Sequence, residues 1–125
     1  QALQQQKILD KENKMMITNH TKFLKTSHMI EKIFLSGLID HIEKEAMPTV
    51  IIVFGSIRKG EYNKESDIDL FIETTKTASL NLAQYEKKLK HRIQVFMESD
   101  IKKLPQELFN NVINGIKLSG YVKIK

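Results

Sequence analysis

Two aspartates separated by one residue, Asp67 and Asp69, are the residues of this sequence best suited to chemistry. They lie in the stretch Ser66-Asp67-Ile68-Asp69-Leu70, whose alternation of polar and apolar residues is typical of a β-strand. Because residues two apart in a strand point the same way, both carboxylates are expected on one face, with their backbones about 7 Å apart. Neighbouring carboxylates repel unless a cation neutralises them, and such oxygen ligands suit Mg²⁺ together with substrate phosphates. The pair therefore predicts a divalent metal site.

A second short motif, Gly55-Ser56, follows the apolar run of residues 50–54 and precedes the aspartates. Glycine lets the backbone approach an anion closely, and free N–H groups at such a turn can cradle a phosphate. Arg58 and Lys59 can add positive charge to the same phosphates. A phosphate cradle and a metal site on neighbouring strands are the two parts that phosphoryl transfer needs.

The elements that must position these motifs follow from the hydrophobic pattern. From Thr21 to Ala46 apolar residues recur every three or four positions, which predicts one long helix that starts after Asn19 and ends before Pro48. The alternation of helices and short apolar strands indicates an α/β (α+β) domain with a small mixed β-sheet flanked by helices. The other elements are expected at residues 50–54 (strand), 67–73 (strand), 82–89 (helix), 93–97 (strand), 104–113 (helix) and 116–124 (short strand).

The first twenty residues are interpreted as a separate extension, residues 1–20, ahead of a catalytic-type domain at residues 21–125. Ile8-Leu9 and Met15-Met16-Ile17 flank a polar stretch, which predicts a β-hairpin over Lys7 to Asn19. This hairpin resembles the wing of a winged-helix domain, so the extension is expected to be the remnant of an upstream nucleic-acid-binding domain.

The composition is that of a globular domain of ordinary size, with 125 residues, 41% of them hydrophobic and 28% charged. The absence of Cys excludes disulfide frameworks, zinc–thiolate sites and thiol nucleophiles, and it favours the cytoplasm. No apolar run is long enough to span a membrane. The net charge of +5 suits an anionic partner without choosing between a nucleotide and a nucleic acid. Part of this charge is interpreted as the solvated end of a helix, at Lys87, Lys88, Lys90, His91 and Arg92.

The combination Gly-Ser-Ile-Arg-Lys-Gly at residues 55–60 and Ser-Asp-Ile-Asp-Leu at residues 66–70 resembles the signature of the DNA polymerase beta-like nucleotidyltransferases, and most closely the minimal nucleotidyltransferases of archaea and bacteria. The resemblance covers roughly residues 30–120. It implies transfer of a nucleoside monophosphate, AMP in the first instance, from a nucleoside triphosphate such as ATP to a hydroxyl acceptor, with Mg²⁺ or Mn²⁺ as cofactor. Asp67 and Asp69 would hold the metal in the catalytic site.

The same resemblance assigns the nucleotide-binding residues. Gly55 and Ser56 would hold the terminal phosphates, with Arg58 and Lys59 beside them, although Lys59 replaces the usual arginine and Arg58 stands where a small residue is common. Ser66 belongs to the same motif, and its hydroxyl is expected to order the loop rather than to contact the nucleotide.

One position departs from the family pattern. The third carboxylate of the family lies on the next strand, and the matching position in this chain is Gln94. An amide accepts a hydrogen bond but takes no proton as a base. Glu98 and Glu73 have the right strand parity to replace this acid, but each lies four residues away, about 13 Å along a strand. Nucleotide binding is therefore better supported than efficient transfer.

Two other kinds of function stay open at this stage. Minimal nucleotidyltransferases are often paired with HEPN-type ribonuclease toxins, so this chain could be a nucleotide-binding antitoxin or regulatory protein whose main partner is a protein. A nucleic-acid partner could bind through an upstream domain. The apolar stripe of the long helix could also extend into a homodimer face. The acceptor and the preferred base do not follow from the sequence.

Overall fold

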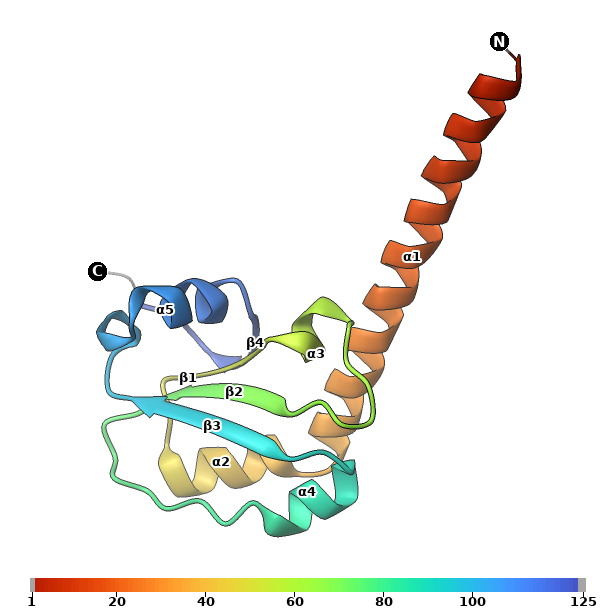
Figure 1. Ribbon diagram of the computed structural model, residues 1–125. Helices are drawn as coiled ribbons and strands as arrows, with labels where there is room; N and C mark the ends of the chain where they lie inside the picture. Colours follow the sequence, from red (N-terminus) through yellow and green to blue (C-terminus); the bar gives the residue numbers. More distant parts are fainter. Residues whose placement is uncertain (1, 124–125) are drawn as a thin grey trace.

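The structure is a computed structural model that describes residues 2–123 (Figure 1). A four-stranded sheet lies at its centre, with helices on both faces, which confirms the mixed α+β fold predicted above. The elements along the chain are α1 (Ala2–Leu35), α2 (Leu38–Ala46), β1 (Val50–Phe54), α3 (Ser56–Lys59), β2 (Ile68–Glu73), α4 (Ala83–Leu89), β3 (Ile93–Glu98), the 3₁₀ turn η1 (Ile101–Lys103), α5 (Gln106–Ile113) and β4 (Ile116–Gly120).

The strands lie in the order β3-β2-β1-β4. β1 runs antiparallel to both β2 and β4, whereas β2 and β3 are parallel and are joined by a crossover that contains α4. β1 is buried along its whole length, as expected for an uncharged run of β-branched residues. The sheet is therefore mixed, and its central strands β1 and β2 carry the two motifs.

Each face of the sheet has its own core. Residues such as Val53 and Leu70 point into a core shared with α1, α2 and α4. Phe54 and Phe71 belong to the opposite face, which α5 and η1 cover (Figure 1). Asp69 has the parity of Phe71 along β2, so its side chain belongs to this second face.

The hairpin predicted for Lys7 to Asn19 is wrong, because these residues lie inside the continuous helix α1. The stretch taken for a turn, Asp10 to Asn13, contains neither Gly nor Pro, and its Lys and Glu are good helix formers. Leu9 and Met16 lie seven residues apart, two helical turns, and so share one side of α1. The structural basis for a winged-helix remnant is therefore lost, and the proposed boundary at residue 20 falls within a helix.

The long helix expected over residues 21–46 is broken in two. The chain turns at Ser36 and Gly37, where Gly37 has a φ of 86° that glycine adopts without strain. The Ser36 hydroxyl donates a hydrogen bond to the Ile33 carbonyl and accepts one from the Leu38 N–H. Asn19, expected as a helix N-cap, lies within α1.

The ends of the other elements differ from the expected ones by a few residues. β2 begins at Ile68 rather than at Asp67, and β4 ends at Gly120 rather than at Ile124, which lies outside the described residues together with Gln1 and Lys125. The single turn of α3 was not expected. No helix within residues 2–123 is long and apolar enough to cross a membrane.

The N-terminal half of α1 projects away from the rest of the molecule (Figure 1). All residues from Gln4 to Thr21 are exposed. Only the second half of the helix reaches the core, through Met29 and Ile33. Large apolar side chains are nevertheless exposed along the helix, at Ile8, Leu9, Met15, Met16, Ile17, Phe23, Leu24, Phe34 and Leu35.

Candidate active site

The two sequence motifs meet where β1 ends. Phe54, the last residue of β1, pairs with Asp69 of β2, so the Asp69 side chain lies beside the turn at Gly55. A Cβ atom placed on Gly55 would lie only 2.5 Å from Asp69 Oδ2. Gly55 also has φ and ψ of 73° and −144°, a region that only glycine occupies readily. Glycine is required here both by the backbone and by the carboxylate that lies against it.

The two aspartates lie close together on the face of the sheet that carries α5. Asp67 immediately precedes β2 and Asp69 is its second residue, so both have the same parity along the chain. Burial raises the pKa of Asp69, and the neighbouring Asp67 carboxylate raises it further. Both effects disfavour the ionised form of Asp69 in the absence of a cation. A divalent ion bound to these oxygens would relieve the repulsion between them.

Gln94 is the residue of β3 that pairs with Asp69. In the parallel pairing of β2 with β3, Gln94 is the Cα partner of Asp69. Its side chain is exposed and lies on the same face of the sheet as Asp69, because Phe96, two residues on, packs with α5 and Phe54. The position across from Asp69 therefore carries an amide.

The two acids weighed as substitutes lie at the far end of the same strand pair. Glu73 and Glu98 are partners of each other, four residues along from Asp69 and Gln94. The Glu73 side chain is buried and accepts a hydrogen bond from the Ile101 N–H, at 2.8 Å. Its role is to hold the start of η1, so it is not available at the aspartate pair. Within the described residues, no group of three or more His, Cys, Asp or Glu side chains is placed to hold one metal ion.

A cavity of about 280 Å³ opens beside Asp69. Arg58 and Lys59 of α3 line it, so the structure brings these two cations to the glycine turn and the half-buried aspartate. Arg58 Nε donates to the Asn114 carbonyl, at 2.7 Å, which holds this side chain against the end of α5. The lining residues are Phe54, Gly55, Arg58, Lys59, Asp69, Asn111 and Asn114.

Asn111 and Asn114 were not anticipated as site residues. Both lie at the end of α5, where the sequence predicted only a helix that ends at residue 113. They reach the site because β4 returns beside β1, which places the turn between α5 and β4 next to Gly55. A Cβ on Gly115 would lie 2.6 Å from the Val53 carbonyl oxygen, so this turn lies directly against β1.

The two serines of the motifs have different positions. Ser56 is the first residue of α3, where the leading N–H groups have no partner within the helix. Ser66 lies in the loop before β2, and its hydroxyl accepts a hydrogen bond from the Asn63 N–H at 2.9 Å. Ser66 lines a different hollow, together with Asp67, and not the cavity at Gly55.

The loop between the two motifs is held by α1. The buried Thr26 hydroxyl donates to the Ile57 carbonyl at 2.8 Å, and Lys25 Nζ donates to the Tyr62 carbonyl at 2.6 Å. The Tyr62 hydroxyl donates in return to the Lys25 carbonyl, and burial raises the pKa of Tyr62. A Cβ on Gly60 would overlap the Lys22 backbone, so α1 and the end of α3 are in close contact.

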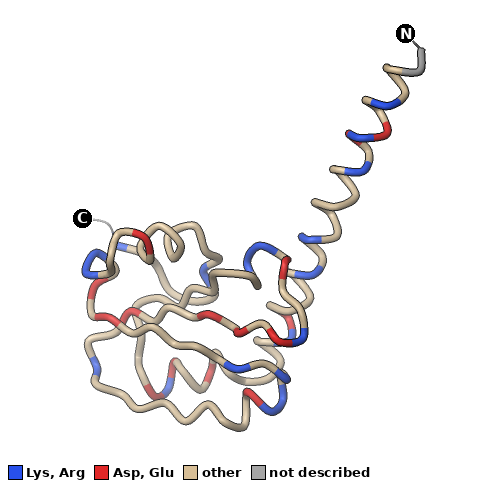
Figure 2. Tube along the Cα trace, viewed as in Figure 1, with Lys and Arg blue, Asp and Glu red and all other residues tan. Residues whose placement is uncertain are grey.

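Acidic and basic residues lie in different places around the aspartates. Acidic positions follow β2, while basic positions lie at α3 on one side and at the turn from α4 to β3 on the other (Figure 2). The aspartates therefore lie between two groups of basic residues, which can bind phosphates.

The turn after β1 thus lies beside two cationic side chains and against a pair of carboxylates, an arrangement that suits phosphoryl transfer. The family comparison agrees: residues 35–118, more than half of the chain, match the family model described as nucleotidyltransferase domain. The chain belongs to this family. The matched region runs from the end of α1 to β4 and includes every residue of the two motifs. No match was found among curated proteins.

Proposed function

We propose that this chain transfers a nucleoside monophosphate, AMP in the first instance, from a nucleoside triphosphate to a hydroxyl acceptor with the help of Mg²⁺ or Mn²⁺. The observation that carries the proposal is the position of the Asp69 carboxylate directly over the Gly55 turn. This position brings the proposed metal ligands next to the turn that is proposed to bind the phosphates.

The donor set fits a hard divalent cation. Asp67 and Asp69 offer carboxylate oxygens, and Mg²⁺ is commonly bound by one or two carboxylates plus substrate phosphates. Burial and the neighbouring Asp67 carboxylate raise the pKa of Asp69, and a bound cation would counter both effects by favouring the ionised form. When bound, the metal would neutralise charge on the triphosphate.

The phosphates would lie in the cavity of about 280 Å³ at the glycine turn. The charged side chains of Arg58 and Lys59 line this cavity and are the donors available there. Ser56, the first residue of α3, follows the lining residue Gly55 directly in the chain. Arg58 keeps its guanidinium at this cavity through its bond to the Asn114 carbonyl. This cavity is close to the lower end of the range for ligand pockets, about 300 Å³, so we assign it to the phosphates rather than to the base.

In the transfer step, the acceptor oxygen forms a bond to the α-phosphorus while the bond from that phosphorus to the pyrophosphate oxygen breaks. The acceptor proton must leave, and the side chain that faces Asp69 from β3, Gln94, takes no proton. In this proposal the proton passes to solvent, since Gln94 is exposed. The reaction is therefore expected to be slow compared with that of a site that has a third carboxylate.

The experiment is a transfer assay with α-labelled ATP and Mg²⁺ or Mn²⁺, in which pyrophosphate release and label on the acceptor are both measured. Asp67→Asn should abolish both signals. Asp10→Asn should leave them unchanged, since Asp10 is exposed and belongs to the N-terminal half of α1, which projects away from the sheet (Figure 1). Metal-dependent pyrophosphate release that survives Asp67→Asn would overturn the proposal.

A second function, binding of a protein partner, is favoured by the exposed apolar residues of α1. Contiguous exposed apolar surface commonly marks an interaction site. A hollow of about 330 Å³ on the flank of α1, lined by Phe23 and Ile30 together with Arg58 and Lys59, adjoins the nucleotide site. A partner on α1 would thus approach the proposed phosphate-binding residues Arg58 and Lys59. By the family resemblance we propose a HEPN-type ribonuclease as this partner, with a second copy of this chain as the alternative.

Sedimentation analysis of the chain, alone and with a purified HEPN-type ribonuclease, tests this second function. Met16→Glu places a charge among the exposed apolar residues, and Lys14→Glu changes a charge on a neighbouring exposed position as the control. Loss of a complex in Met16→Glu alone supports binding through α1. A homodimer that Met16→Glu dissociates would assign the surface to a second copy, and equal behaviour of all three proteins would exclude this surface as the contact.

A further inference from the structure

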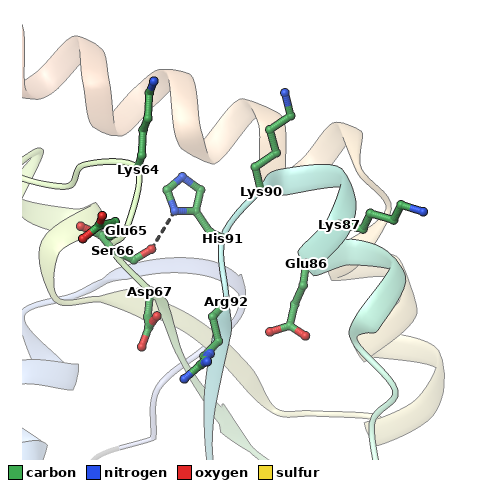
Figure 3. Close-up of a pocket in the computed structure, with 9 residues that line it drawn as sticks. All are labelled: Lys64, Glu65, Ser66, Asp67, Glu86, Lys87, Lys90, His91 and Arg92. Atoms are coloured by element: carbon green, nitrogen blue, oxygen red, sulfur yellow. Dashed lines mark hydrogen bonds between the residues drawn. The ribbon is translucent and has the colours of Figure 1, made fainter.

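A second and larger hollow, of about 650 Å³, lies at the Asp67 end of the aspartate pair. Three segments of the chain form it: the loop that precedes β2, the end of α4, and the first residues leading into β3 (Figure 3). We call it the Asp67 groove. Its lining residues are Lys64, Glu65, Ser66, Asp67, Glu86, Lys87, Lys90, His91 and Arg92.

The side chains of the Asp67 groove favour an anionic ligand. Four of the lining residues are Lys or Arg, and they come from all three segments. Three other lining residues are acids, so Lys and Arg exceed the carboxylates by one. Glu86 is turned toward the backbone, where its Oε2 accepts a hydrogen bond from the Ile93 N–H at 2.9 Å. Asp67 is assigned to the metal. Glu65 is the one remaining acid that lines the groove.

One wall of the groove is fixed by His91. Its Nδ1 lies 2.7 Å from the Ser66 carbonyl oxygen, a contact visible in Figure 3. The His91 ring also stacks edge-on against Tyr62, with ring centroids 6.1 Å apart. Because Lys25 and Tyr62 exchange hydrogen bonds, this wall is anchored to α1. The groove is thus held in shape by contacts within the protein.

Arg92 connects the groove with the catalytic face of the sheet. The Ile68 N–H donates to the Arg92 carbonyl at 2.8 Å, which extends the pairing of β2 with β3 by one step. Arg92 has the strand parity of Gln94, so its side chain belongs to the face of Asp67 and Asp69. In Figure 3 the side chains of Arg92 and Asp67 extend to the same side, away from Lys64 and Lys90.

We propose that the Asp67 groove is the acceptor subsite and that it takes the phosphate-bearing end of a single-stranded polynucleotide. Arg92 is a positioning residue that holds the phosphate next to the terminal hydroxyl, while Lys87 and Lys90 bind phosphates further along the strand. Lys87, Lys90 and Arg92 extend in different directions in Figure 3, so they suit successive phosphates of a strand better than a single phosphate. This inference rests on the nucleotidyl-transfer function proposed above and names its acceptor.

The test is binding of a fluorescent twelve-nucleotide single-stranded RNA with a free 3′ hydroxyl, followed by anisotropy at several salt concentrations. Lys87→Gln/Lys90→Gln should weaken binding roughly five- to tenfold and reduce the salt slope by about 1.4, since each phosphate contact to a single strand contributes about 0.7. Arg92→Gln should weaken binding too, and Arg92→Lys should restore part of it. The matched control is Lys102→Gln/Lys103→Gln, which removes two exposed charges from η1, outside the groove.

Competition for the bound RNA distinguishes a polynucleotide ligand from other phosphate-containing or anionic ligands. Inorganic phosphate, AMP and poly-glutamate should displace the RNA only at far higher concentrations, and saturating Mg²⁺-ATP should leave the RNA bound. Displacement by Mg²⁺-ATP would assign the groove to the donor nucleotide and overturn the inference. Equal potency of AMP, or equal weakening by the η1 control, would also overturn it.

Failure of this inference and failure of the proposed function give different results. RNA binding that is lost in the groove variants but kept in Asp69→Asn, which lies outside the groove, supports the groove even where ATP binding is absent. ATP binding in a protein that shows no RNA binding would instead retain the nucleotide site and reject a polynucleotide acceptor.

Discussion

The Asp69 carboxylate lies so close to Gly55 that position 55 has no room for a side chain, since a Cβ atom there would be 2.5 Å from Asp69 Oδ2. Gly55→Ala should therefore displace Asp69 and weaken Mg²⁺-ATP binding more than tenfold. Alanine at a φ of 73° would also strain the backbone, which is expected to lower the free energy of unfolding by about 1–3 kcal/mol. Calorimetric titration and chemical denaturation measure the two effects.

Gly37→Ala is the matched control for this substitution. Gly37 has a φ of 86°, but a Cβ there would meet only the edge of the Tyr85 ring at 3.9 Å. Both variants should lose stability through the backbone, and only Gly55→Ala should lose nucleotide binding. Equal nucleotide affinity in Gly55→Ala and Gly37→Ala would contradict the assigned contact.

Gln94→Glu should increase the rate of nucleotidyl transfer. Gln94 is the β3 partner of Asp69, so a carboxylate there would stand across from the metal ligands and could take the acceptor proton. A gain of roughly tenfold or more in kcat is expected, since a positioned general base contributes typically about 10²–10⁴-fold. Gln94→Ala should bring no gain. A rate that is unchanged or lower in Gln94→Glu would mean that proton removal at this position does not limit transfer.

The sheet and the aspartate pair could be predicted because their signals are local. Val50 to Phe54 is a short apolar run, which indicates a buried strand. Asp67 and Asp69 alternate with Ile68 and Leu70, so this two-residue repeat indicates both a strand and the face on which each side chain lies. Gln94 was placed opposite the aspartates by the resemblance to the family, and the pairing of β2 with β3 makes it the Cα partner of Asp69.

Other features depend on contacts between distant segments. Asn111 and Asn114 reach the cavity because β4 returns beside β1, and Arg92 joins the catalytic face because of the register of β2 with β3. The hairpin error at Lys7 to Asn19 has a local cause, because short apolar clusters fit either a strand or one side of a helix. The break at Gly37 was missed because a single glycine lowers helix stability only slightly, by about 1 kcal/mol.

Asp69→Asn should stabilise the metal-free protein at neutral pH. The pKa of Asp69 is raised in the folded state by burial and by Asp67, so the folded protein holds this proton more tightly than the unfolded chain does. The resulting stability is present below the ordinary Asp pKa, about 3.9, and is lost as the pH rises through the folded-state value. Above it, the ionised carboxylate lowers stability, and an amide removes this cost.

Thermal denaturation with a chelator measures this effect. The Tm of Asp69→Asn should exceed that of the unaltered chain at pH 7.5, and the difference should vanish near pH 3.5. Asp10→Asn, on an exposed part of α1, should show no such pH dependence. A lower Tm for Asp69→Asn at pH 7.5 would show that the carboxylate stabilises the metal-free fold.

Thr26→Val should loosen α1 from the loop that carries the phosphate cradle. The Thr26 hydroxyl is buried and donates to the Ile57 carbonyl at 2.8 Å, so its loss leaves a buried acceptor without its partner. A loss of about 1–3 kcal/mol in unfolding free energy is expected. Chemical denaturation gives this value. Thr18→Val, whose hydroxyl bonds within α1 at an exposed position, should change stability by less than about 0.5 kcal/mol.

The most direct test of the nucleotide site is calorimetric titration of Mg²⁺-ATP into the chain and into Asp67→Asn/Asp69→Asn. Asp10→Asn/Glu12→Gln, which removes two acids from the exposed half of α1, is the control. The site described above predicts Mg²⁺-dependent binding to the unaltered chain and the control, and none to the aspartate variant. Absence of binding to the unaltered chain with either Mg²⁺ or Mn²⁺, or equal binding to the aspartate variant, would contradict it.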